Sequence, residues 1–301
     1  MVPSKKRQDS VQHLGTVVSV HGQFARVADS DGKVLRLRSR QRLPALASGD
    51  EVTFGASGSI EALLNRRSEL IRNDRLGRPR IVAANLDLVA VVWAPVPHTP
   101  DLFVDRYLVV LTAQQLPVLL LGSKADQTDP AHASARRTVR CRYTGLGYDW
   151  LDISAKTGAG LEALRGALRG KVVALVGQSG VGKSSIVNAL AERDVQDVGD
   201  LTRDDRHGTH TTSAARLLRL PGEVTLVDSP GIRSLGTNHL APAEVARGFP
   251  ELLEPASRCR FRDCLHQLEP DCQVRATLAN GELDPVRMHS YATMLAESLE
   301  S

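Results

Sequence analysis

The sequence has few aromatic residues and no long apolar run. Phe, Trp and Tyr make up 4% of its 301 residues, so we expect a core built from Val, Leu, Ala and Ile. A membrane-spanning helix needs about 20 apolar residues in a row, and the most apolar stretch (81–97) is interrupted by Asn85, Asp87 and prolines. The polar first ten residues have no apolar segment behind them, unlike a secretory signal. We therefore expect a cytoplasmic protein with no membrane partner.

Cysteine and net charge are also low. Four cysteines in a reducing compartment are expected to be metal ligands or free thiols and not disulfides. The formal net charge of +4 is compatible with a polyanionic partner but does not identify one. The length favours two or three domains.

Strand and helix signals divide the chain into four predicted regions. Residues 1–10 form a basic, disordered arm, and residues 11–72 carry about five short alternating runs that favour an OB-type β-barrel, although another small β-module stays open. An Arg-rich connector (66–80) follows. In residues 73–240, apolar strands alternate with helices, which predicts a doubly wound, parallel α/β sheet. Residues 241–301 are expected to be helical around a cysteine cluster.

A phosphate-binding loop is predicted at GQSGVGKSS, residues 177–185. It matches G-x-x-x-x-G-K-[ST] and lies between a predicted strand and a predicted helix, the context that the motif requires. Lys183 is expected to act in catalysis by reaching the β- and γ-phosphates, and the Ser184 hydroxyl to bind Mg²⁺. The predicted nucleotide-binding residues here are Gly177, Gln178, Ser179, Gly180, Val181, Gly182, Lys183, Ser184 and Ser185.

Two further elements concern the phosphates and the base. DSPG (228–231) matches D-x-x-G, so we expect Asp228 to contact Mg²⁺ and Gly231 the γ-phosphate. GSKAD (122–126) is similar to the guanine-reading N-K-x-D, with Ser123 in the Asn position, Lys124 along the base and Asp126 accepting two hydrogen bonds from it. Such pairing rejects adenine strongly.

A third element, SAK (Ser154, Ala155, Lys156), could contact the guanine carbonyl through the Ala155 N–H. Each short element alone could be a turn or a helix cap; together, at strand ends, they predict a GTP site. The guanine elements precede the phosphate loop, whereas ordinary GTPases have them after it. Ligands of parallel sheets lie across the C-terminal ends of the strands, so chain order does not matter to the pocket. We predict a circularly permuted GTPase domain.

A metal site is predicted near the C-terminus. Cys259, Cys264, His266 and Cys272 suit a closed, tetrahedral and therefore structural Zn²⁺ site; reactive or disulfide-bonded cysteines remain the alternative. Cys141 is expected to be a buried or idle thiol. Nearby arginines and the N-terminal arm could contact nucleic-acid phosphates or be ordinary solvated charge: Arg258, Arg260, Arg262, Lys5, Lys6 and Arg7.

The order of barrel, GQSGVGKSS, DSPGI and Cys/His cluster resembles the RsgA (YjeQ-type) family of small ribosomal subunit biogenesis GTPases. The resemblance implies a bacterial, cytoplasmic protein that binds the small ribosomal subunit and its rRNA. It also implies hydrolysis of GTP to GDP and phosphate late in subunit maturation, stimulated by the subunit. A monomer is the default. The family's His-Thr-Thr-Thr segment corresponds to HTTS (210–213), so Thr212 is the expected Mg²⁺ contact, with Thr211 as the alternative.

The hydrolytic group is the least defined part of the site. Ile232 follows Gly231, where many GTPases place a water-orienting Gln, so intrinsic turnover is expected at about 10⁻⁴ to 10⁻² s⁻¹. His210 is the candidate to orient water, and His207 is a weaker one; His210 could equally be a surface or RNA-contacting residue. A ribosome-binding module with nucleotide-gated binding but little turnover stays open, and an ATP-using kinase is disfavoured by Asp126.

Overall fold

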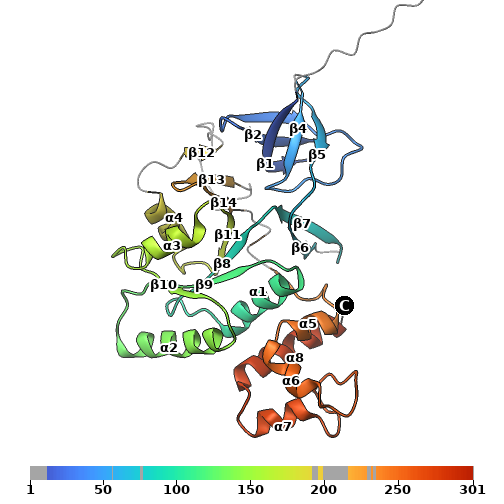
Figure 1. The fold of residues 1–301 in the computed structure, drawn as a ribbon, viewed down its shortest axis with the longest axis vertical. Coiled ribbons are helices and arrows are strands. Elements are labelled where there is room, and N and C mark those ends of the chain that lie inside the picture. Colours follow the sequence, from blue (N-terminus) through green and yellow to red (C-terminus); the bar gives the residue numbers. More distant parts are fainter. Residues whose placement is uncertain are drawn as a thin grey trace, which may run out of the picture.

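The computed structural model of the chain describes residues 12–55, 57–74, 77–191, 196–198, 216–228, 232 and 235–300. Its N-terminal part is a small closed barrel (Figure 1). Five antiparallel strands pair in the order β3-β2-β1-β4-β5, and a parallel bridge between Arg38 and Ser59 joins the two edges. Val17, Val27 and Ile60 fill its core. The OB-type barrel is confirmed, with strands β1 (His13–His21), β2 (Phe24–Asp29), β3 (Val34–Arg38), β4 (Glu51–Phe54) and β5 (Ile60–Leu63).

The expected Arg-rich connector is in fact a β-hairpin. β6 (Glu69–Asn73) and β7 (Pro79–Ala84) pair in antiparallel fashion, with Leu70 and Ala83 fully buried. The Gln114 side chain accepts a hydrogen bond from the Ile71 N–H at 2.8 Å and donates one to the Ile71 carbonyl at 2.9 Å. These contacts anchor the hairpin to the end of a helix in the next region. Charged side chains on its exposed face hide the strand alternation in the sequence.

The central region is a seven-stranded sheet in the order β10-β9-β8-β11-β14-β13-β12. The first five strands in this order are parallel, and β13 and β12 add an antiparallel edge. β8 is buried along its whole length, as expected for a strand covered on both faces. The strands are β8 (Leu88–Trp93), β9 (Val118–Gly122), β10 (Trp150–Asp152), β11 (Val172–Gly177), β12 (Gln196–Val198), β13 (Arg216–Leu220) and β14 (Val224–Asp228).

Helices cover both faces of this sheet. Alternate residues of β8 pack into separate cores: Trp93 lies in the core shared with α1 (Asp101–Ala113) and α2 (Pro130–Gly145), and Val92 in the core shared with α3 (Leu161–Leu168) and α4 (Lys183–Leu190). The doubly wound α/β fold is therefore confirmed. Among the described helices, none is both long enough and apolar enough to cross a bilayer.

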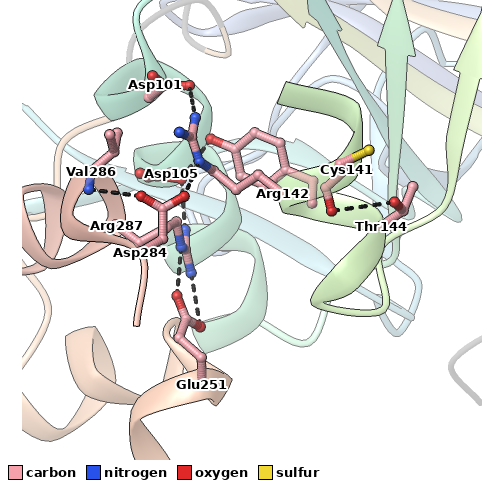
Figure 2. Close-up of polar contacts among 10 residues, drawn as sticks. Asp101, Asp105, Cys141, Arg142, Thr144, Glu251, Asp284, Val286 and Arg287 are labelled. Atoms are coloured by element: carbon pink, nitrogen blue, oxygen red, sulfur yellow. Dashed lines mark hydrogen bonds and ion pairs between the residues drawn. The ribbon is translucent and has the colours of Figure 1, made fainter. Parts of the chain in front are cut away.

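Two of the C-terminal helices, α5 and α8, pack against α1 (Figure 1). Arg287 on α8, with its side chain 2% exposed, pairs with Asp105 of α1 at 2.6 Å and with Glu251 of α6 at 2.7 Å. Tyr143 of α2 donates a second hydrogen bond to the Asp105 carboxylate. Figure 2 shows this buried cluster, which holds the C-terminal helices on the sheet domain: α5 (Pro242–Arg247), α6 (Pro250–Ala256), α7 (Gln273–Ala279) and α8 (Pro285–Leu299).

Candidate functional site

The predicted phosphate loop connects β11 to α4 and borders a cavity of about 700 Å³. Gly182, which precedes α4, has a φ of 105°, a conformation that side chains rarely adopt. A Cβ atom there would also lie 3.0 Å from the Ser123 hydroxyl oxygen. Val181 instead turns its side chain into the core. The cavity is lined by Phe103, Gly177, Gln178, Ser179, Gly180, Gly182, Lys183, Ser184 and Ser185.

The Lys183 side chain folds back over the loop. Its ammonium donates hydrogen bonds to the carbonyl oxygens of Gly177 at 2.7 Å and Gln178 at 2.6 Å. The N-terminus of α4 begins at the same residue, so the first turn of the helix and a cation both lie at the cavity. This combination attracts anions, phosphate above all.

The two predicted guanine elements lie in contact. Asp126 accepts a hydrogen bond from the Ser154 hydroxyl at 2.7 Å, and this bond, more than any other contact, holds the pKa of Asp126 below its ordinary value. The nearby charge of exposed Lys156 acts in the same direction. The Ala125 N–H donates to the Ile153 carbonyl at 3.0 Å. A carboxylate that stays ionised is suited to accept hydrogen bonds from a base.

The guanine elements also reach the phosphate loop. Lys124 donates hydrogen bonds to the Gly180 carbonyl at 2.9 Å and to the Val96 carbonyl at 2.6 Å. The neighbouring Ser123 is buried, with its hydroxyl against Gly182. The order β10-β9-β8-β11-β14 explains the meeting, because each of these parallel strands delivers its following loop to the same edge of the sheet. The structure thus brings together segments that lie far apart in the sequence.

Some predicted residues lie at or beyond the limits of the described residues. Asp228 is the last residue of β14, beside β11. Ile232 has its side chain buried, and its carbonyl accepts a hydrogen bond from Tyr107 of α1 at 2.9 Å. It therefore packs into the core instead of facing the cavity. The residues that lie outside the described ones are the arm 1–10, His207, His210, Thr211, Thr212 and Gly231.

The Cys/His cluster is assembled as predicted and could hold one metal ion. The ligand atoms of Cys259, Cys264, His266 and Cys272 lie within 4.8 Å of one another. The His266 Nδ1 atom is 3.7 Å from the Cys259 sulfur and 3.5 Å from the Cys272 sulfur, and these two sulfurs are 4.0 Å apart. Bonds of about 2.3 Å to sulfur and 2.0 Å to nitrogen give a tetrahedron with edges of about 3.5–3.8 Å. The cluster fits a four-coordinate ion.

Neighbouring groups hold the cluster in this form. The Glu269 carboxylate accepts hydrogen bonds from the backbone N–H groups of Leu265, Gln267 and Leu268, which fixes the loop that carries His266. Burial lowers the pKa of His266, and a neutral imidazole is the form that binds metals. Cys141, by contrast, is an exposed free thiol on α2.

Sequence reasoning missed two contributors to the nucleotide cavity. Phe103 lines it from the first turn of α1, and the Val96 carbonyl holds Lys124. Both follow the C-terminal end of β8, which lies between the strands that carry the recognised motifs. Neither residue belongs to a motif, so the only sequence signal for them is that they follow the end of a predicted parallel strand.

Comparison with known proteins agrees with this architecture. A family model described as RsgA GTPase matches residues 63–238. The chain is 42% identical over 294 residues to the small ribosomal subunit biogenesis GTPase RsgA of Pseudomonas aeruginosa (strain LESB58), covering 96% of this chain and 87% of that protein. The Azotobacter vinelandii protein of the same name is 42% identical over 290 residues, covering 95% and 84% of the two chains.

Two solved structures are similar over nearly the whole chain. YjeQ from Thermotoga maritima superposes with a TM-score of 0.75 at 31% identity, covering 97% of this chain and 100% of that one. YloQ, described as a circularly permuted GTPase, gives a TM-score of 0.71 at 25% identity, covering 99% and 98%.

Proposed function

The chain belongs to the RsgA GTPase family, and we propose that it hydrolyses GTP to GDP and phosphate while it acts in maturation of the small ribosomal subunit. The observation that carries this proposal is the contact between the guanine elements and the phosphate loop: Lys124 bonds Gly180, and Asp126 lies on the same short loop. One edge of the sheet thus offers a carboxylate for a base and a cation with helix N–H groups for phosphates.

In the proposed complex, Asp126 accepts hydrogen bonds from guanine and the Ala155 N–H contacts its carbonyl. Lys183 exchanges the carbonyls of Gly177 and Gln178 for the β- and γ-phosphates. A Mg²⁺ ion bound with GTP would neutralise charge between these phosphates. The residues that we propose to hold it are Ser184, Asp228 and Thr212.

Hydrolysis needs a group to orient the attacking water, and Ile232 does not face the cavity. We assign this role to His210, in the segment between β12 and β13. The absence of a glutamine at position 232 supports slow intrinsic turnover that rises when the small subunit docks.

The C-terminal region is the proposed responder to nucleotide state. Helix α1 carries Tyr107, which bonds Ile232 just after DSPG, and also carries Asp105, which pairs with Arg287 of α8. A shift at Gly231 on loss of the γ-phosphate could thus reach the metal cluster through one helix. If the cluster holds the same position with GDP and with a GTP analogue, this coupling is wrong.

The remaining assignments follow from family membership and residue chemistry. We propose that the cluster binds one structural Zn²⁺, that the protein contacts rRNA as a monomer, and that it works in the cytoplasm, where ribosomes mature. The proposed regions are residues 1–10, 11–72, 73–240 and 241–301. The limit at residue 72 falls within β6, which makes the hairpin the link between barrel and GTPase region.

Phosphate release from GTP and from ATP, each with and without purified small subunits, tests the proposed activity. We expect GTP-selective release that rises many-fold with subunits and is lost in Lys183→Ala. Tight GTP binding without stimulated release would instead support a ribosome-binding module with nucleotide-gated binding, the reading that Ser123 and Ile232 favour. Equal release from ATP would contradict the assignment of Asp126.

A further inference from the structure

The guanine-reading loop has an unusual backbone that needs support. Lys124 has a φ of 57°, a left-handed conformation that costs energy for any residue with a Cβ atom. At position 123 this chain has Ser, whose short hydroxyl lies against Gly182 and cannot span the distances that the usual Asn amide covers. Another group must therefore fix the loop on which Asp126 stands.

Arg136, on α2, makes that contact. Its side chain is 11% exposed, and one terminal nitrogen donates hydrogen bonds to the carbonyl of Ser123 at 2.9 Å and to that of Lys124 at 2.7 Å. These carbonyls belong to the two peptide units that flank the Lys124 Cα atom. Holding both of them fixes the backbone dihedrals of Lys124 and thus the direction of the chain toward Asp126.

Arg136 also forms an ion pair with Asp152. Its Nε atom lies 3.4 Å from the Asp152 carboxylate, which also accepts a hydrogen bond from the Trp150 ring at 2.9 Å. Asp152 ends β10, and its side chain crosses the end of β9 at Gly122. A Cβ atom on Gly122 would lie 2.4 Å from an Asp152 oxygen. Glycine at this position therefore keeps the path open between the carboxylate and the guanidinium.

We propose that Arg136 is the positioning residue for guanine recognition in this chain, held by Asp152 and acting through the backbone of Ser123 and Lys124. The proposal rests on the proposed GTP site. Arg136 does not touch the base; it sets where the Asp126 carboxylate stands. Its loss should affect the hydrogen bond from the 2-amino group of guanine more than contacts with the phosphates.

The test measures dissociation constants of GDP, IDP and ADP for the full-length, metal-loaded protein, because IDP lacks only the 2-amino group that Asp126 would bind. The wild type should prefer GDP to IDP and IDP to ADP. In Arg136→Met we expect the preference for GDP over IDP to fall about tenfold, the effect of losing a well-placed hydrogen bond to a charged group, with a much smaller change for ADP. Arg136→Lys should lie in between.

Arg140→Met is the matched control. Arg140 lies one turn further along α2 and pairs with the same carboxylate at 3.0 Å, but its side chain is 56% exposed. Its loss should leave the GDP-to-IDP ratio unchanged. A uniform loss for all three nucleotides, or no change, in folded Arg136→Met would overturn the proposal; if that variant does not fold, the same readings on Arg136→Lys decide. A wild type that does not distinguish GDP from ADP would instead contradict the GTP site itself.

Discussion

The nucleotide cavity and the Cys/His cluster are built in opposite ways. The cavity borrows loops from neighbouring parallel strands, and its contacts are largely made by backbone atoms, such as the carbonyls that hold Lys183 and Lys124. The cluster takes four side chains from residues 259–272 and encloses them. The first site is held by the sheet beneath it, whereas the second depends on four side chains from one short segment that could share a metal ion.

This difference predicts different responses to an empty site. A cavity framed by a sheet keeps its shape without ligand, because burial of strands such as β8 stabilises it. A cluster of cysteines depends on its metal, since binding and folding of small metal modules are coupled. Removal of the ligand should therefore unfold the surroundings of the Cys/His cluster but not those of the nucleotide cavity.

The largest effect is expected for Cys272→Ser or for chelation of the metal. Structural zinc supplies about 10–16 kcal/mol of apparent folding free energy in small modules, so the C-terminal helices should lose cooperative unfolding while GDP binding persists. Metal content by mass spectrometry and thermal melts followed by circular dichroism measure both. Cys141→Ser, at an exposed thiol, should behave as wild type. Unchanged melting after metal loss would refute this dependence.

The next effect concerns the attachment of the C-terminal helices. Arg287→Met leaves the fully buried Asp105 without its cation, and breaking such a pair costs about 3–5 kcal/mol. Urea unfolding should show this loss in the transition that includes α8. The control is Arg258→Met, whose pair with Glu254 is largely exposed and worth at most about 1 kcal/mol. Equal losses in the two variants would contradict the importance of burial.

Lys183→Ala should weaken nucleotide binding without lowering the stability of the fold. Removing the cation from the cavity is expected to weaken GTP binding about 10- to 100-fold, as for loss of hydrogen bonds to a charged group. The melting temperature without nucleotide should stay close to wild type, because the hydrogen bonds from the Lys183 ammonium to the carbonyls of Gly177 and Gln178, at 2.7 and 2.6 Å, lie within one loop. Titration with a fluorescent GTP analogue measures binding, and a thermal melt measures stability. A large drop in melting temperature would contradict the prediction that the cavity keeps its shape without this cation.

The smallest effect is a pH dependence of the helix contact. Hydrogen bonds from Arg106, aided by Thr237, hold the pKa of Glu297 below its ordinary value of 4.5. The pair therefore stabilises the fold fully above pH 4.5 and loses this contribution as the pH falls through the lowered pKa. At neutral pH, Glu297→Gln should cost no more than about 1 kcal/mol because solvent reaches the pair. The gap to wild type should close in acid; a constant gap would disprove the linkage.

Local patterns were predictable where the contacting atoms are close in sequence. The phosphate loop and the Cys/His cluster each need only a short segment to display their chemistry. The sequence predicts a connector where the structure has the hairpin at residues 69–84, because arginines interrupt the alternation that marks a strand. Arg136 cannot be selected from the sequence either, because α2 carries four arginines that nothing in the local sequence distinguishes: Arg136, Arg137, Arg140 and Arg142.

The available groups can be read from short segments of the chain: a phosphate loop, a carboxylate for a base, four metal ligands and a permuted order of motifs. Which of these groups meet depends on how the elements pack. Strand order places the loops after β9, β8 and β11 side by side, and helix packing turns one arginine of α2 toward the guanine loop. Such contacts depend on sheet topology and on which side chains burial leaves facing each other, and neither is encoded in any short stretch of residues.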